Sequence, residues 1–231
     1  MADWQYNEFR QIGVDFSDLQ QVLKYDDREQ TKLVEERALV QQLGIHAGQV
    51  VVEYGCGTGA FALAAAEAGA QVIATDVSKV MLAYAERRAA AAGLAVQFVH
   101  AGFLSYRHTA APADVVVSKF ALHHLPDFWK QQALGNIHAL LRPRGVFYLQ
   151  DVVYSFAPQD ADAAIEDWIA AMAREDGSGF SRTDFEMHIR EEHSTYAWVL
   201  EGMFARAGFT LREQQFDSPT YASYLVQKGT P

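Results

Sequence analysis

Short apolar runs recur along this chain and alternate with longer segments in which apolar residues have helical spacing. Runs typical of buried strands lie at 50–52, 71–75, 95–99, 114–118 and 145–151. Helical patterns lie between them, at 58–68, 78–92 and 127–141. Ser78 is a typical first residue of a helix, and Gly69 and Gly93 are typical residues at which helices end. Strands that alternate with helices predict a parallel sheet with helices on both faces.

The end of the chain departs from this alternation. Two strand-like runs, 209–216 and 221–228, are separated only by Asp217-Ser218-Pro219-Thr220. Because so short a connection cannot contain a crossover helix, the two strands are predicted to pair antiparallel. The predicted fold class is therefore α/β: a Rossmann-like, mostly parallel sheet with a C-terminal antiparallel hairpin, helices on both faces and a helical cap.

Residues 1–45 precede the first strand and are predicted to form a helical arm or lid. Apolar residues there recur near helical spacing, and a helix is expected from Arg28 to Leu43. Its inward positions are predicted to be Leu33, Val34, Leu39 and Val40. The remaining domain, 46–231, holds the sheet.

A long interval, at about 152–208, separates the fifth strand from the hairpin and is predicted to be a helical insertion. Three helices are expected there, at about 160–175, 182–191 and 195–206. Ser181 and Asp184 have the spacing of a capping box for the second helix, and Ser194 is expected to cap the third. Arm and insertion are expected to cover the sheet edge and to enclose a pocket.

Composition narrows the function. The chain has 231 residues, half of them hydrophobic, and a formal net charge of -10. Such an acidic balance argues against nucleic acid as a partner, because phosphate binding needs a basic face. The single cysteine, Cys56, cannot form an internal disulfide, and no leader or membrane-spanning run is recognisable. We therefore expect a cytoplasmic protein without a membrane partner; its oligomeric state is not predicted.

Candidate chemistry concentrates in the stretch that ends the first strand. Gly55, Gly57 and Gly59 alternate there, directly before an alanine-rich helix. Glycines let the backbone turn tightly and let a ligand approach closely. Unpaired N–H groups at a helix start bind anionic groups, so we expect the loop to bind a cofactor. Gly55-x-Gly57-x-x-Ala60 also satisfies the dinucleotide fingerprint, which keeps a nicotinamide cofactor open.

The whole stretch resembles motif I of the class I S-adenosylmethionine-dependent methyltransferases, small-molecule type. That family has an apolar run, an acidic residue and Gly-x-Gly-x-Gly, which here are Val50–Val52, Glu53 and Gly55–Gly59. Asp76 ends the second strand about 20 residues later, as the ribose-binding acid of such folds does. The antiparallel hairpin fits this family also, whereas a nicotinamide-binding domain continues with parallel units.

The resemblance implies S-adenosylmethionine as cofactor and a set of residues that contact it. These are Tyr25, Glu53, Gly55, Cys56, Gly57, Gly59, Asp76, Val77, Met81, Gly102, Phe103 and Lys119. The chain departs from the family at two of its motifs. Gly102 stands where the family often has an aspartate that accepts from the adenine amino group, and Arg144 replaces a glycine of the turn at 141–145.

The implied reaction is transfer of a methyl group to a small-molecule acceptor by in-line displacement. Because the donor is already activated, positioning supplies much of the catalysis, up to roughly 7–11 kcal/mol. Candidate catalytic residues are His123, His124, Asp151 and His188. A histidine near its free pKa can accept a proton at neutral pH, whereas Asp151 is expected to orient the acceptor.

Other readings stay open at this point. The sequence has no H-E-x-x-H motif and no Cys/His cluster, so no metal is expected. An apolar pocket lining is expected from the aromatic residues Tyr6, Phe9, Tyr25, Phe120 and Tyr154. The alternative functions are an NAD(P)-dependent oxidoreductase and a protein that binds the cofactor without chemistry.

Overall fold

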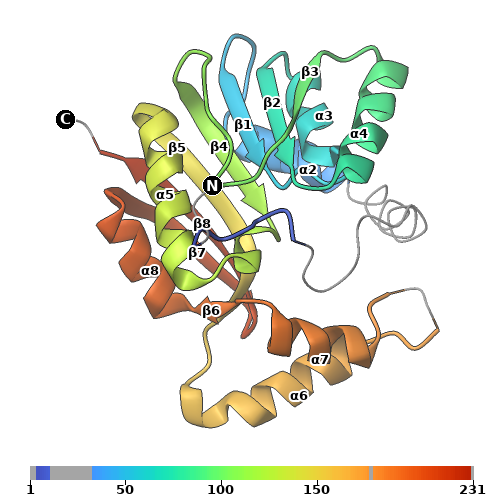
Figure 1. The fold of residues 1–231 in the computed structure, drawn as a ribbon, viewed down its shortest axis with the longest axis vertical. Coiled ribbons are helices and arrows are strands. Elements are labelled where there is room, and N and C mark those ends of the chain that lie inside the picture. The colour runs from blue at the N-terminus through green and yellow to red at the C-terminus, as the bar shows by residue number, and fades with distance from the viewer. Residues whose placement is uncertain (1–3, 11–32, 177–178, 230–231) are drawn as a thin grey trace.

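The computed structural model describes residues 4–10, 33–176 and 179–229. Its centre is one twisted sheet with the strand order β3-β2-β1-β4-β5-β8-β7 (Figure 1). The parallel strands are β1 (Val50–Tyr54), β2 (Gln71–Asp76), β3 (Val96–His100), β4 (Ala113–Lys119) and β5 (Leu141–Tyr154). The hairpin is β7 (Phe209–Ser218) and β8 (Tyr221–Lys228), and β8 pairs antiparallel with both β5 and β7. The predicted fold class, with its inserted antiparallel strand, is confirmed.

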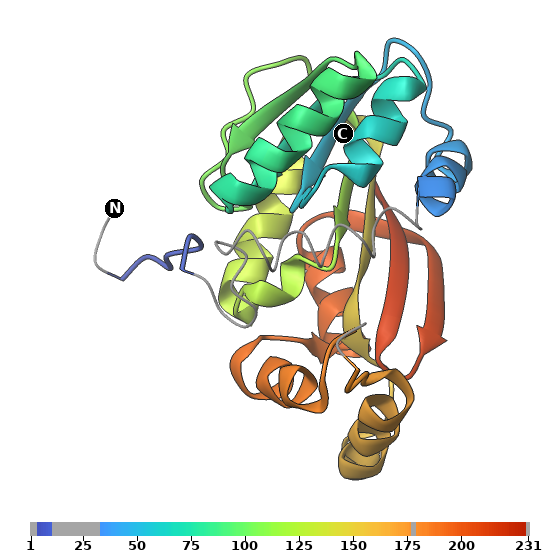
Figure 2. The ribbon, with the colours of Figure 1, turned by 90° about the vertical axis from the view of Figure 1, so that its right-hand side faces the viewer.

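Helices cover both faces of the sheet, as the alternation along the strands requires (Figures 1 and 2). Val51, Val115 and Val117 face one layer, which packs with α2 (Leu33–Gln42), α3 (Ala60–Glu67) and α4 (Lys79–Ala92). Val52 and Val116 face the other, which packs with α5 (Asp127–Leu140) and α8 (Ala197–Arg206). Neighbouring residues of one strand point to opposite faces, so both cores depend on the same buried strands.

Helices α6 (Ala161–Met172) and α7 (Arg182–Glu191) form a separate layer that projects below the sheet in Figure 1. They follow a 3-10 turn, η2 (Pro158–Asp160), and share a small core of Val152, Trp168, Ile169 and Phe185. The predicted capping box at the start of α7 is present, with reciprocal bonds between Ser181 and Asp184. We call α6 and α7 the cap.

The third helix expected in this interval belongs elsewhere. Leu200 and Phe204 of α8 are buried in the main core beside α5 and the hairpin. Its N-cap residue is Tyr196, so the prediction that Ser194 caps it is wrong. The reason is that Thr195 and Tyr196 form a short strand, β6 (Thr195–Tyr196), alongside the end of β5 and delay the helix start.

The arm also departs from its prediction. Residues 4–10 form turns instead of a helix, and the Tyr6 hydroxyl donates to the His124 carbonyl at 3.0 Å. In α2, Val34 is 74% exposed and the acidic Glu36 points inward in its place. The polar residue can be buried because Lys119 pairs with it. The expected start of this helix, with Tyr25, lies outside the described residues.

The turn expected at 141–145 is instead the beginning of β5. Arg144 adopts a left-handed φ of 63° there, at the position where the resembling family has glycine. Left-handed backbone costs a residue with a Cβ atom roughly 1–2 kcal/mol. Within the part of the chain that the structure describes, no helix has the length and apolar character needed to cross a membrane.

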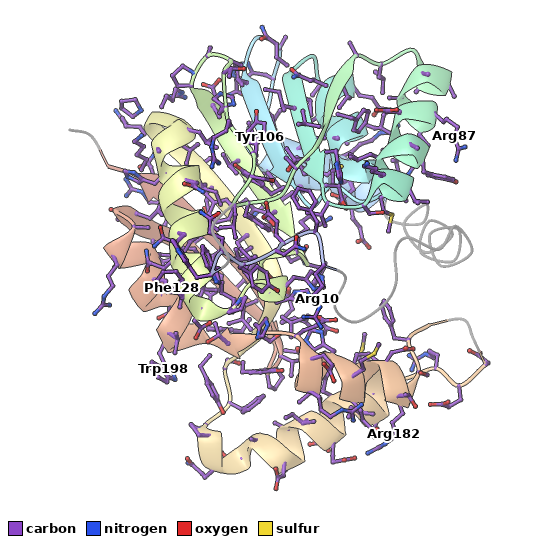
Figure 3. The ribbon with its side chains drawn as sticks, in the orientation of Figure 1. Arg10, Arg87, Tyr106, Phe128, Arg182 and Trp198 are labelled. Carbon is purple, nitrogen blue, oxygen red and sulfur yellow. The ribbon has the colours of Figure 1, made fainter. Side chains whose placement is uncertain are left out.

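The packing of α8 leads to a stability prediction. Phe204 is 2% exposed and packs against Phe147, Phe209 and Tyr224, so Phe204→Ala should lower the free energy of unfolding by about 3–5 kcal/mol. Trp198, on the same helix, is 68% exposed and projects outward in Figure 3. Trp198→Ala should change this free energy by no more than about 0.5 kcal/mol. Urea unfolding measures both, and equal losses would contradict the assignment of α8 to the main core.

Candidate functional site

A cavity of about 710 Å³ lies where the carboxyl ends of the parallel strands face the cap. Its lining includes Gly57 after β1, Asp76 at the end of β2 and Lys119 at the end of β4, and it continues to Phe185 and His188 of α7. The carboxyl edge is where open α/β sheets bind ligands, and the volume suits a small-molecule site. Arg10, labelled in Figure 3, lines the cavity from the N-terminal segment.

The three glycines of the loop have different roles. All three have a left-handed φ, at 69° for Gly55, 52° for Gly57 and 83° for Gly59. A Cβ atom at Gly55 would collide with Ala121, and one at Gly59 would lie 3.0 Å from the Cβ of Ala85. Gly55 and Gly59 are therefore required by protein packing, as well as by the turn. Gly57 lines the cavity, so a side chain there would project toward a bound ligand.

The loop N–H groups are largely engaged within the protein, contrary to expectation. Gly55 and Cys56 both donate to the Thr75 carbonyl, at 2.9 and 3.0 Å. Gly59 donates to the Cys56 carbonyl at 2.8 Å, and the Gly57 N–H donates to the Asp76 carboxylate at 2.9 Å. These bonds shape the loop before any ligand arrives, which leaves fewer loop donors for an anionic group than the pattern suggested.

Asp76 connects the loop to the start of α4. Its second oxygen accepts from the Ser78 N–H at 2.8 Å, and the Ser78 hydroxyl accepts from the Met81 N–H as the N-cap of α4. Burial raises the pKa of the Asp76 carboxyl, and hydrogen bonds from Ser78 and Gly57 oppose this shift. Each carboxylate oxygen can accept a further bond, so Asp76 can receive a ribose hydroxyl from the cavity that it lines.

Most of the residues expected to contact the cofactor line the cavity, and the others lie behind the lining or outside the described residues. The cavity is lined by Gly55, Gly57, Asp76, Val77, Met81, Gly102, Phe103 and Lys119. Glu53, Cys56 and Gly59 lie behind this lining, and Tyr25 is outside the described residues. Of the aromatic residues expected in the pocket, Tyr6 and Phe120 line it. Phe9 packs instead on His100, and Tyr154 on Phe156 and Tyr196.

A carboxylate that the sequence did not reveal lies over Gly102. The Glu8 side chain reaches from the N-terminal segment and accepts from the N–H groups of Leu104 and Ser105, at 2.8 and 2.7 Å. A Cβ atom at Gly102 would collide with this carboxylate. Glu8 also lines the cavity. The chain therefore has an acidic group beside the position where the resembling family carries one.

Three charged side chains lie together beneath the loop. Lys119 forms an ion pair with Glu36, whose side chain is buried. Glu53 is also buried, and burial together with the charge of Glu36 raises the pKa of its carboxyl well above the usual range. Among the described residues, one oxygen each of Glu36 and Glu53 has no hydrogen-bond partner. Two buried carboxyl groups thus lie beside one lysine, and their unpartnered oxygens are acceptors for a cationic ligand group.

A second polar cluster lies at the cap end of the cavity. It begins with His123 and His124 of the 3-10 turn η1 (Leu122–His124). The His123 Nδ1 atom contacts the Asp151 carboxylate at the end of β5, and its Nε2 atom lies 3.0 Å from Glu192 Oε2. The His188 Nδ1 atom lies 2.5 Å from the same Glu192 oxygen. Three of the four expected catalytic residues, His123, Asp151 and His188, are thus brought together, and His124 lies beside His123 with a ring separation of 4.3 Å.

The two adjacent histidines are in opposite electrostatic situations. Burial opposes protonation of His123, but the charges and hydrogen bonds of Asp151 and Glu192 outweigh it and raise its pKa to about 9. Burial and the charge of His123 lower the pKa of His124 to about 4. The hydrogen bonds of His123 and His188 outweigh burial at Glu192 and hold the pKa of its carboxyl well below the usual range. Neither His123 nor His124 has the pKa near 7 that suits a general base.

Glu192 was not among the expected site residues. It follows α7 at four residues from His188, and this i, i+4 spacing was the available signal. Its pairing with His123 joins two segments that are far apart in the sequence. The ligand atoms of His123, His188 and Glu192 lie within 4.8 Å of one another, so they are able to hold a metal ion.

Comparison with known proteins identifies the family. A family model described as a methyltransferase domain matches residues 51–145. An uncharacterized methyltransferase of Anoxybacillus flavithermus is 30% identical over 165 residues, which cover 71% of this chain and 71% of that protein. An uncharacterized methyltransferase of Geobacillus kaustophilus is 28% identical over 206 residues, which cover 89% of this chain and 90% of that protein.

A solved structure agrees at the level of the fold. The magnesium protoporphyrin IX methyltransferase of Synechocystis PCC 6803, with bound S-adenosylmethionine, superposes with a TM-score of 0.59 at 16% identity. The match covers 96% of this chain and 88% of that one. The relatives and the strand order together decide against the nicotinamide alternative. This chain is an enzyme of the class I S-adenosylmethionine-dependent methyltransferase family.

Proposed function

We propose that this enzyme transfers the methyl group of S-adenosylmethionine to a small-molecule acceptor bound between the sheet edge and the cap. One observation carries the proposal: a single cavity is lined by the glycine loop and Asp76 at one end and by α6 and α7 at the other. In the reaction, a lone pair of the acceptor forms the new bond to the methyl carbon. The carbon–sulfur bond breaks, and its electron pair stays on sulfur as S-adenosylhomocysteine leaves.

The described residues fit the two ends of the cofactor. We assign the ribose hydroxyls to Asp76 and the methionine end to the group of Glu36, Glu53 and Lys119. Lys119 lines the cavity and suits the carboxylate, and the unpartnered oxygens of Glu36 and Glu53, which lie behind this lining, suit the ammonium. Tyr25 and the arm at 1–45 remain predictions, as does the division into arm, domain and insertion at about 152–208.

Glu8 is assigned to the adenine. Its carboxylate lies over Gly102, where the family carries an acid on the loop itself, and it already accepts two N–H groups of that loop. A carboxylate has about four acceptor sites, so the exocyclic amine of adenine can be bound in addition. The N-terminal segment would thus supply a contact that the loop has lost.

The acceptor is assigned to the cap end. His123, His124 and His188 line the cavity there, and Asp151 lies behind His123 and acts through it. Apolar lining comes from Trp168, Phe180 and Phe185. The net charge of -10 disfavours RNA or DNA as acceptor.

The test of function is a turnover screen of small hydroxyl, amine and thiol compounds with S-adenosylmethionine. Productive compounds gain one CH2 group in mass as S-adenosylhomocysteine forms. With the best acceptor, Phe180→Ala should raise its KM about tenfold, since the aromatic contact supplies roughly 1.5 kcal/mol. The affinity for S-adenosylhomocysteine should not change. Phe128→Ala is the control, because Phe128 is exposed, lies on α5 and does not line the cavity (Figure 3). If Phe180→Ala weakened the binding of S-adenosylhomocysteine and left the KM of the acceptor unchanged, this assignment would be contradicted.

The role of the glycine loop in cofactor binding is tested by two replacements that should cause similar backbone strain, Gly57→Ala and Gly93→Ala. Gly57 and Gly93 both have a left-handed φ, at 52° and 67°, so Ala costs each about 1–2 kcal/mol. Gly93 ends α4, and a Cβ atom there meets open space. Both variants should melt cooperatively, but only Gly57→Ala should lose the rise in melting temperature caused by S-adenosylhomocysteine. Retention of that rise in Gly57→Ala would show that Gly57 serves the turn alone.

The assignment of Glu8 is tested with a cofactor analogue. The wild-type enzyme should bind S-adenosylhomocysteine at least tenfold more tightly than its analogue without the exocyclic amine, as expected for a hydrogen bond to a charged group. Glu8→Gln should reduce this ratio toward one. Glu35→Gln, at an exposed position of α2, should keep it. If Glu8→Gln lowers the melting temperature yet keeps the ratio, Glu8 only holds the loop.

A further inference from the structure

The cluster at the cap end has the construction of a metal centre. Two imidazole nitrogens, His123 Nε2 and His188 Nδ1, point at the same oxygen of Glu192, at 3.0 and 2.5 Å. The three ligand atoms lie within 4.8 Å of one another. A metal ion at about 2.0–2.2 Å from each of them would separate these atoms by about 3 Å or slightly more. The arrangement needs only a small opening to receive such an ion.

Each histidine is held by its other nitrogen. The His123 Nδ1 atom contacts Asp151, whose carboxylate is itself fixed by the N–H groups of His123 and Val152, at 3.1 and 2.8 Å. The Nε2 atom of His188 lies 2.9 Å from the Ser194 hydroxyl. Metal-bound histidines almost always have such a partner, because it fixes the tautomer and the ring orientation.

Burial and charge favour a cation at this place. The side chains of His123, Glu192 and His188 are 7%, 8% and 14% exposed. Two carboxylates, Asp151 and Glu192, are buried around two histidines, and buried charge is stable only when it is compensated. A divalent ion would balance both carboxylates directly.

We propose that His123, His188 and Glu192 bind one divalent transition-metal ion, with Asp151 as the positioning partner of His123. Two imidazoles and one carboxylate suit zinc or ferrous iron, whereas magnesium and calcium prefer oxygen ligands. The sequence analysis expected no metal, because the ligands come from η1, from α7 and from the residue after α7, and they match no local motif.

The remaining coordination positions face the methyl acceptor. All three ligands line the cavity, so an oxygen, sulfur or nitrogen atom of the acceptor can bind the ion from that side. A bound metal ion lowers the pKa of a coordinated hydroxyl or thiol and produces a nucleophile at neutral pH. This consequence rests on the proposed function, whereas the metal site itself does not.

The test uses the full chain without a histidine tag, stripped with a chelator and titrated with Zn2+ in the absence of cofactor. One equivalent should bind per chain, and Co2+ should give the visible spectrum of a protein-bound ion. Asp151→Asn should weaken binding roughly 10–100-fold, the effect of losing an outer partner. His188→Ala and Glu192→Gln should weaken it further, and His46→Ala, at an exposed histidine, should leave it unchanged.

Two results would overturn the proposal. One is a wild-type chain that takes up no more Zn2+ than His188→Ala. The other is binding that persists unchanged in Glu192→Gln, whose side chain has the same size and whose folding is checked by its melting curve. Binding of S-adenosylhomocysteine is measured on the same samples. Intact cofactor binding without metal would leave the methyl-transfer proposal standing.

Discussion

The arrangement of the site depends on the close packing of Ala121 against Gly55. Any side chain at Gly55 would collide with Ala121. Phe120 turns the chain into this contact with a left-handed φ of 51°, and its N–H donates to the Gln150 carbonyl at 2.8 Å. The segment after β4 therefore crosses directly beside the glycine loop and continues into η1. This contact holds the cofactor loop beside the segment that leads to His123 and His124, and both parts line a single cavity.

The features that the sequence predicted correctly depend on residues that are close together along the chain. A buried strand, three glycines and a helix are contiguous, so their pattern describes β1, the loop and α3 without long-range information. The position of Asp76 at the carboxyl edge of the sheet was predicted because the residue ends a strand at a known distance from the glycines. The hairpin followed from a four-residue connection that excludes a helix. At each of these points, backbone conformation and chain length were sufficient.

What the sequence did not predict depends on contacts between distant segments. Glu8 lies over a loop about a hundred residues further along, and nothing in its own neighbourhood distinguishes it from a solvated acid. Glu36 occupies an inward position that hydropathy assigns to Val34, and its ion pair with Lys119 stabilises that burial. Glu192 pairs with His123 across the cap. The position of each of these polar side chains depends on a distant partner, and hydrophobic patterning gives no information about that partner.

The two polar ends of the cavity have complementary tasks in methyl transfer. During the displacement the sulfonium loses its positive charge, so carboxylates placed at the sulfur would stabilise the reactant and slow the reaction. The unpartnered oxygens of Glu36 and Glu53 are useful only if they bind the ammonium, whose charge does not change. At the other end, the acceptor gives up a lone pair as it attacks, and a hydroxyl or thiol must lose its proton to make that lone pair reactive. A cation held by the proposed ligands His123, His188 and Glu192 would lower the pKa of such a hydroxyl or thiol and so supply its reactive form at neutral pH. Carboxyl groups kept away from the sulfur and a cation that would activate the acceptor thus have separate tasks at the two ends of the cavity.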